Sequence, residues 1–189
     1  MRGGTWQIDD PDELQDHALD RSCVGLTCRI HLLCDVQGHP LHFQRTAEQA
    51  YESTLLDDVL IDPDQQLYDG QGEPLAWPAA LAGNKGYRAD WIDSYLLELA
   101  IQAVIPSKSN GDRNARSVAF DHEVDRGRNS IELLVGCLKE CRRICSRFGK
   151  AAKNFGGMIK MAFIRRHHKL PTLSVLRRSL ICDGQMVHD

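Results

Sequence analysis

The sequence contains no run of uninterrupted apolar residues that approaches the ~18 needed to span a membrane. Residues 1–20 also lack the hydrophobic core of a signal peptide, and neither an internal repeat nor a long linker is present. The 189 residues are 42% hydrophobic and 26% charged, which are ordinary values for one globular domain. These features favour a single cytoplasmic domain with a sizeable core over a membrane protein or a disordered chain.

Although the chain has seven cysteines, no Cys-X-X-Cys pair occurs. Cys28 and Cys34 would share one face of a strand, whereas His31 between them has the opposite parity and would point away. The cysteines of residues 137–145 recur at every fourth position beside the apolar seam of a predicted helix, where small thiol side chains commonly pack. We therefore expect reduced core cysteines rather than structural zinc or disulfides.

Acidic residues are scarce in the second half of the chain. Residues 1–99 hold 6 Lys or Arg and 18 Asp or Glu, whereas residues 100–189 hold 17 and 8. Residues 126–178 hold 14 basic residues and only two acidic ones, Glu132 and Glu140. Such a segment would be attracted to a polyanion, with binding that falls steeply as salt rises. The alternatives are a solvated basic face, or one that docks on the acidic half of the same chain.

Turn residues and hydrophobic periodicity divide the chain into an expected order of elements. These are a β-hairpin of residues 26–36 and 41–46, a helix after Ser53 that ends before Pro63, a strand of residues 79–83, a helix of residues 91–99, a strand of residues 103–105, a long helix around Glu132 and a second helix around residues 155–166. Strand, helix and strand in succession imply a parallel crossover unit. The sequence therefore predicts an α/β fold.

Glu132 stands on the polar face of the long predicted helix, with Arg128 four residues before it and Lys139 seven after it. At ~100° per residue, the three side chains lie within about 40° of one another around the helix axis. A carboxylate flanked by cations suits a metal-and-phosphate site. It suits an ion pair on an exposed helix face equally well, and the residues leave both interpretations open.

Asn84 directly follows the predicted strand of residues 79–83. In α/β sheets, the loops at the carboxyl ends of the strands form the functional crevice. If the Glu132 helix packs against the same sheet, the two side chains would converge on one site. The alternative is that Asn84 is simply a turn residue, because Asn is common before Lys-Gly.

Three blocks of residues resemble the DDE-type transposases of bacterial insertion sequences, in the subgroup whose catalytic domain has an RNase-H-like fold. The blocks are residues 25–31 with Asp35, Gly38 and Pro40, residues 81–91, and residues 128–132 continuing to Lys139. Their order and spacing match the family, and the resemblance runs from about His17 to His168. It implies an RNase-H-like mixed sheet with flanking helices.

The resemblance also implies a role in DNA transposition, in which DNA strands are cleaved and joined at the ends of the insertion sequence. Such transposases use two Asp and one Glu carboxylate to hold two divalent ions, usually Mg²⁺, roughly 4 Å apart. Glu132 takes the place of the family's Glu and is the implied metal ligand. Arg128 and Lys139 match the signature around it, and we assign them, with Arg142 and Arg143, to contacts with double-stranded DNA.

The chain departs from the family's pattern in three respects. The second catalytic Asp is replaced by Asn84, whose neutral amide would hold Mg²⁺ much more weakly. Asp125 stands where the helix signature has Tyr. The first Asp, on the opening central strand of the family's sheet, lies upstream of the matching region, and Asp9 is the only visible stand-in.

We therefore expect a sheet that lacks its opening strand and a chain that is catalytically inactive. The expected divisions are a loose lead-in of residues 1–22, a partial catalytic domain of residues 23–169 and a divergent tail of residues 170–189. The alternatives are a non-catalytic DNA-binding fragment and a decayed insertion-sequence relic without a molecular role. The expected partners are double-stranded DNA, a second copy and an intact transposase, in the bacterial cytoplasm at the nucleoid.

Overall fold

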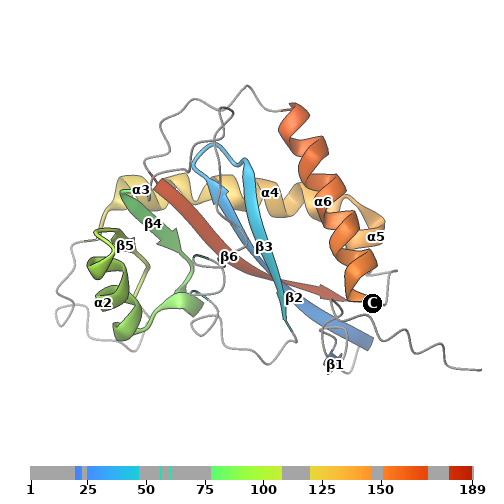
Figure 1. The fold of residues 1–189 in the computed structure, drawn as a ribbon, viewed down its shortest axis with the longest axis horizontal. Helices are drawn as coiled ribbons and strands as arrows, with labels where there is room; N and C mark the ends of the chain where they lie inside the picture. The colour runs from blue at the N-terminus through green and yellow to red at the C-terminus, as the bar shows by residue number, and fades with distance from the viewer. Residues whose placement is uncertain are drawn as a thin grey trace, which may run out of the picture.

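The computed structural model describes residues 20–22, 25–46, 56, 60, 78–107, 120–145, 151–169 and 179–188. In the first and last strands and at residues 25–27 it describes the backbone alone, except at Ile181. The fold is mixed α/β, as predicted, with a six-stranded sheet flanked by helices (Figure 1). None of the described helices is both long and apolar enough to cross a membrane.

The predicted hairpin forms one side of the sheet. β2 (Gly25–Asp35) and β3 (Pro40–Thr46) pair antiparallel, and β1 (Asp20–Ser22) pairs antiparallel with the beginning of β2. In the turn between β2 and β3, Gly38 has a φ of 81°, which glycine adopts without steric cost. A Cβ at this position would lie 3.3 Å from the carbonyl oxygen of Ser130. The turn therefore needs glycine for its backbone conformation and for its close contact with the neighbouring helix.

The predicted parallel crossover forms the other side of the sheet. β4 (Ala80–Gly83) leads through the short 3₁₀ helix η4 (Lys85–Tyr87) into α2 (Asp90–Glu98). β5 (Gln102–Val104) then returns parallel to β4. Because β4 and β5 run parallel, the loops that follow them lie at the same end of the sheet.

The centre of the sheet is occupied by β6 (Ser179–His188). β6 pairs antiparallel with β2 and parallel with β4, so the strand order is β1-β2-β6-β4-β5, with β3 also paired to β2 (Figure 1). The expected gap at the centre of the sheet is therefore not found, because residues 179–188 of the predicted divergent tail fill it. Pairing on both sides of β6 covers the backbone edges that β2 and β4 would otherwise expose.

The long helix predicted around Glu132 is divided in three: α3 (His122–Gly127), α4 (Asn129–Lys139) and α5 (Arg142–Cys145). The prediction of one continuous helix was wrong in this respect. The bend after α4 turns the buried side chain of Ile144 into the core that α4 already covers. The apolar face predicted for α4 is confirmed, and its buried residues are Ile131, Leu134, Val135 and Leu138.

The second predicted helix is confirmed as α6 (Ala152–Lys169), which Gly156 and Gly157 do not interrupt. Gly156 is buried beside Arg45 of β3, and a Cβ there would lie 3.1 Å from a guanidinium nitrogen. The same guanidinium donates a hydrogen bond to the carbonyl oxygen of Ala152. The small residue thus allows α6 to approach β3 closely.

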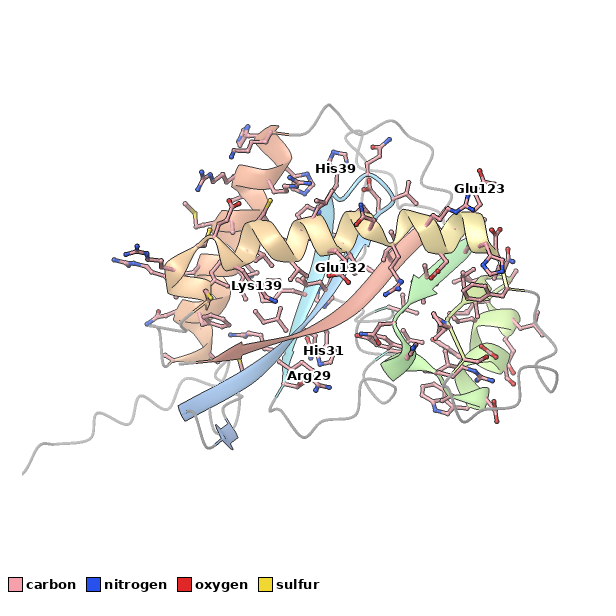
Figure 2. All side chains as sticks on the ribbon, turned by 180° about the vertical axis from the view of Figure 1, so that it is seen from behind. Arg29, His31, His39, Glu123, Glu132 and Lys139 are labelled. Atoms are coloured by element: carbon pink, nitrogen blue, oxygen red, sulfur yellow. The ribbon has the colours of Figure 1, made fainter. Side chains whose placement is uncertain are left out.

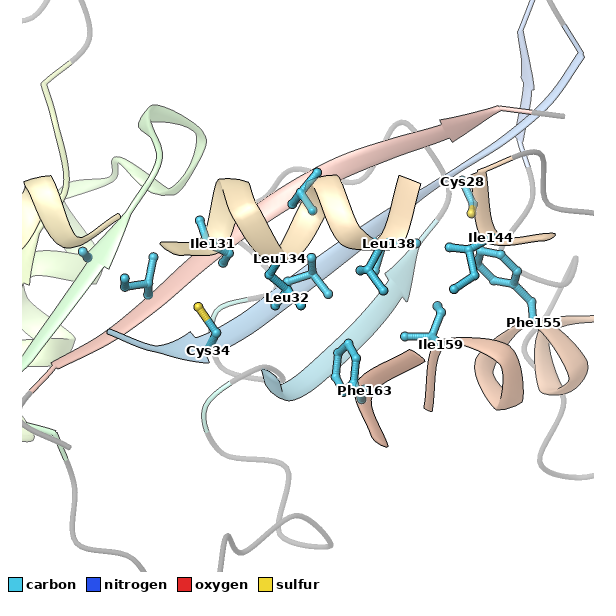
Figure 3. Packing of buried hydrophobic residues seen from close by; sticks show 14 of the residues in the cluster. Cys28, Leu32, Cys34, Ile131, Leu134, Leu138, Ile144, Phe155, Ile159 and Phe163 are labelled. Atoms are coloured by element: carbon cyan, nitrogen blue, oxygen red, sulfur yellow. The ribbon is translucent and has the colours of Figure 1, made fainter. Parts of the chain in front are cut away.

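Two apolar cores lie on the two faces of the sheet. The larger core packs α4, α5 and α6 against the sheet, with labelled members Cys28, Leu32, Cys34, Ile131, Leu134, Leu138, Ile144, Phe155, Ile159 and Phe163 (Figure 3). The smaller core packs α2 against the opposite face around Leu33, Leu81 and Tyr87. Of the helix predicted after Ser53, only Leu56 and Leu60 lie within the described residues, and both are helical. Asp9 lies outside the described residues.

Candidate functional site

A recess of about 420 Å³ opens where β4 and β5 end. Among the described residues, it is lined by Asn84, Lys85, Gly86, Pro106 and Arg128. The first three follow β4, Pro106 follows β5, and Arg128 comes from the junction of α3 and α4. Arg128 and Asn84, which lie far apart in the sequence, thus meet at the carboxyl ends of parallel strands, as in other α/β sites.

Asn84 is held in a turn by its own side chain. Its Oδ1 accepts a hydrogen bond of 2.7 Å from the backbone N–H of Gly86, which caps the start of η4. The interpretation of Asn84 as a turn residue is therefore correct in its local geometry, although the residue also lines the recess. An aspartate would make the same turn, because its carboxylate oxygen can accept the same N–H.

The ion pair between Arg128 and Glu132, the alternative to a functional site, is not formed within the described part of the chain. Arg128 instead donates from Nε to Oδ1 of Asp125 at 3.3 Å. The Glu132 carboxylate is exposed on the first turn of α4 and makes neither a hydrogen bond nor an ion pair with any described residue (Figure 2). Its position near the amino end of α4 favours negative charge through the helix dipole, which is a sufficient structural reason for an acidic residue there.

Asp125 thus replaces the expected Tyr with a residue that binds the neighbouring arginine. The two side chains keep 27% and 30% exposure, so their ion pair contributes less than about 1 kcal/mol to stability. It nevertheless fixes one nitrogen of the Arg128 guanidinium beside the recess.

The predicted DNA-contact residues lie on the helical side of the sheet. Lys139 at the end of α4 and Arg142 and Arg143 in α5 are exposed. The exposed basic residues of α6 are Lys153, Lys160, Arg165, His168 and Lys169. The structure does not bring Lys139, Arg142 or Arg143 into the recess, whose only predicted DNA-contact residue among those described is Arg128.

A hydrogen-bonded chain, which the sequence analysis did not find, holds Tyr87, the last residue of η4, directly after the recess residues Lys85 and Gly86. His31 Nδ1 lies 3.0 Å from the Tyr87 hydroxyl, and His31 Nε2 lies 2.9 Å from Thr46 Oγ1. Burial, assisted by the positive charge of Arg29, lowers the pKa of His31 to about 4. The neutral imidazole can donate to one partner and accept from the other, so it ties η4 to β2 and β3. The sequence alone predicts only that His31 points to the opposite face of its strand from Cys28 and Cys34.

The residues Asp35, Gly38 and Pro40 of the first resembling block form a structural turn. The buried Asp35 carboxylate accepts from the backbone N–H of His39 and lies 2.9 Å from His39 Nδ1. His39 stacks on His167 of α6, whose Nε2 donates to the carbonyl oxygen of Pro40 at 2.9 Å. These contacts dock α6 on the hairpin and give the Asp35 carboxylate a structural role.

The described side chains do not fit a centre for two Mg²⁺ ions. Such a centre needs several carboxylate oxygens, whereas Asn84 contributes a neutral amide and Glu132 the one carboxylate of the predicted set. Among the described residues, no three His, Cys, Asp or Glu side chains form a group that could hold a metal ion. Asn84, with a neutral amide where the resembling family has a metal-binding carboxylate, is the residue that does not fit such a centre.

No protein-family model matches this chain. No curated protein and no solved structure matches it either. The resemblance to DDE-type transposases therefore stays a prediction from the residues of the three blocks.

Proposed function

We propose that this chain is a protein of the DDE transposase family that binds double-stranded DNA and, with Asn at position 84, does not cleave it. The single observation that carries the proposal is the position of β6 at the centre of the sheet. The resemblance requires a central strand there, paired with the hairpin on one side and with the strand before Asn84 on the other. β6 meets both requirements.

This strand order supports an RNase-H-like fold as the finer description of the sheet. The family's opening strand would precede the hairpin, whereas β6 follows α6 in the sequence. Its last residue, His188, nevertheless pairs with Thr27 near the start of β2. The central strand thus lies beside the beginning of the hairpin, as an opening strand would. In the sequence, however, β6 is the last element and not the first.

Asp183 is the position that we propose for the family's first Asp, in place of Asp9. Gly83 and Cys182 are register partners in β4 and β6, and Asn84 and Asp183 are the next residues in each segment. α4, which carries Glu132, packs against β2 and β6. Position 183 of the backbone is therefore next to position 84, under the helix that bears the third residue of the set.

The basic surface of α4, α5 and α6 supports DNA as the partner. Its exposed residues include Lys139, Arg142, Arg143 and Lys160, whereas Glu132 and Glu140 are the only acidic residues in the sequence from Asn129 to Lys169. Neutralising backbone phosphates with such residues releases counterions and supplies most of the affinity for any duplex. We infer that this surface contributes to DNA affinity independently of the DNA sequence.

The lack of cleavage follows from the charge at position 84. Two Mg²⁺ ions bring four positive charges, and replacing an anionic ligand by a neutral amide leaves the ions poorly held. The test is an incubation of labelled duplexes with Mg²⁺ or Mn²⁺, using Glu132→Gln as the control. We expect the wild-type chain and the control to give equal, background levels of nicking. Nicking by the wild-type chain above the control would contradict the proposal of an inactive site.

A further inference from the structure

The described lining of the recess beside Asn84 includes two cations and no carboxylate. Its described lining supplies the cations of Lys85 and Arg128, the amide of Asn84, and the backbone of Gly86 and Pro106. Asp125 engages only Nε of Arg128, and a guanidinium has four further N–H donors. The volume of about 420 Å³ is within the range of small-molecule sites.

We propose that this recess binds a phosphate group directly, without a metal ion. Arginine presents paired N–H donors that match two phosphate oxygens, and lysine adds a point charge. The phosphate group is either free inorganic phosphate or part of a DNA strand. The DNA source depends on the function proposed above, whereas binding of free phosphate does not.

Asn84 is the residue that makes metal-free binding favourable. With Asp at this position, its carboxylate would face the same two cations and would repel a phosphate group unless a metal ion lay between them. The neutral amide removes that repulsion. Asn84 therefore makes the recess more favourable to an anion than Asp would.

The matched variant is Asn84→Asp, because its carboxylate can still accept the Gly86 N–H and preserve the turn. Inorganic phosphate is titrated into the full chain in EDTA, and its affinity is followed by the NMR shifts of the backbone amides of residues 84–86. We expect Asn84→Asp to weaken phosphate affinity at least tenfold and Lys85→Gln at least threefold. Arg126→Gln, which removes an exposed cation of α3 outside the recess lining, should keep the affinity within a factor of two.

The source of the phosphate is then resolved with short duplexes that do or do not carry 5′-phosphates. A shift of the residue 84–86 amides by both duplexes supports a backbone phosphate, and a shift by the phosphorylated duplex alone supports a terminal phosphate. Equal phosphate affinity of the wild type and Asn84→Asp, or equal losses with Lys85→Gln and Arg126→Gln, would overturn the proposal. If the duplexes fail to bind while free phosphate still shifts these amides, the proposed function fails and the phosphate site stands.

Discussion

Gly83 of β4 and Cys182 of β6 are register partners in the parallel part of the sheet. The next residue after each is a polar one, Asn84 and Asp183. Because parallel strands run in the same direction, both follow the pair toward the same end of the sheet. A segment that the sequence analysis assigned to a divergent tail thus lies beside the candidate site.

The position of β6 predicts a large effect of truncating Ile181. This side chain is fully buried in the larger core, and removal of a buried Ile side chain leaves a cavity. We expect Ile181→Ala to lower the free energy of unfolding by about 2–5 kcal/mol in chemical denaturation. Ile164→Ala, at a site on α6 with 52% exposure, should change it by less than about 0.5 kcal/mol. Equal, small effects of the two substitutions would place β6 outside the core.

His31 predicts a loss of stability in mild acid. Its pKa is lowered to about 4 in the folded chain, whereas the unfolded chain binds the proton near pH 6.5. As the pH falls from 6.5 to 4, the unfolded state gains a proton that the folded state resists, so the free energy of unfolding decreases. The loss amounts to at most about 3 kcal/mol. It should level off below pH 4, where both states are protonated.

The control for this effect is His31→Gln, which cannot titrate. Its unfolding free energy, measured by urea denaturation between pH 7 and pH 4, should fall less steeply than that of the wild type, even if the variant is less stable throughout. Identical slopes for the two proteins would show that His31 is not the group responsible.

The basic helices predict salt-dependent binding to duplexes of unrelated sequence. Each phosphate contact contributes about −0.9 to the slope of log affinity against log salt concentration. Arg142→Gln combined with Arg143→Gln should therefore reduce the magnitude of the slope by about 1–2, as measured by fluorescence anisotropy. Arg88→Gln serves as the comparison, because Arg88 is engaged by Asp90 and Asp93 of α2. A slope that does not respond to the α5 changes would assign DNA contact to another surface.

The buried and exposed cysteines predict a clear order of reactivity. Cys28 and Cys34 have no exposed surface, whereas Cys145 is exposed at the end of α5. Maleimide labelling of the native chain, followed by mass spectrometry, should modify Cys145 rapidly and leave Cys28 and Cys34 unmodified until the chain unfolds. Rapid labelling of Cys28 would contradict the antiparallel pairing of β2 and β6 over a closed core.

The elements that the sequence predicts correctly are those with local signals. The turn at Gly38 marks the hairpin, and the apolar spacing from Ile92 to Leu96 marks α2 between two apolar strands. β6 has no such signal, because the Asp183-Gly184 pair in its middle is typical of a turn. Its extended form depends on pairing with strands more than 90 residues away in the sequence, which local patterns do not report.

The same distinction applies to the candidate site. The sequence indicates Asn84 and Glu132 through their place after a strand and on a helix face, and the structure brings Asn84 together with Arg128. The contact of Arg128 with Asp125 rather than Glu132 depends on the junction of α3 and α4. The chain from Thr46 through His31 to Tyr87 depends on the stacking of three separate elements.

The central proposal, that Asn84 stands where the resembling family has a metal-binding Asp, in a set with Asp183 and Glu132, is tested most directly by Mn²⁺ titration of the Asn84→Asp chain, followed by calorimetry. We predict that this variant binds Mn²⁺ at least tenfold more tightly than the wild type. Adding either Asp183→Asn or Glu132→Gln to this variant should abolish the gain in Mn²⁺ affinity. The wild-type chain should bind Mn²⁺ only weakly. A variant that binds Mn²⁺ no better than the wild type, or a gain that survives both additional substitutions, would contradict the claim.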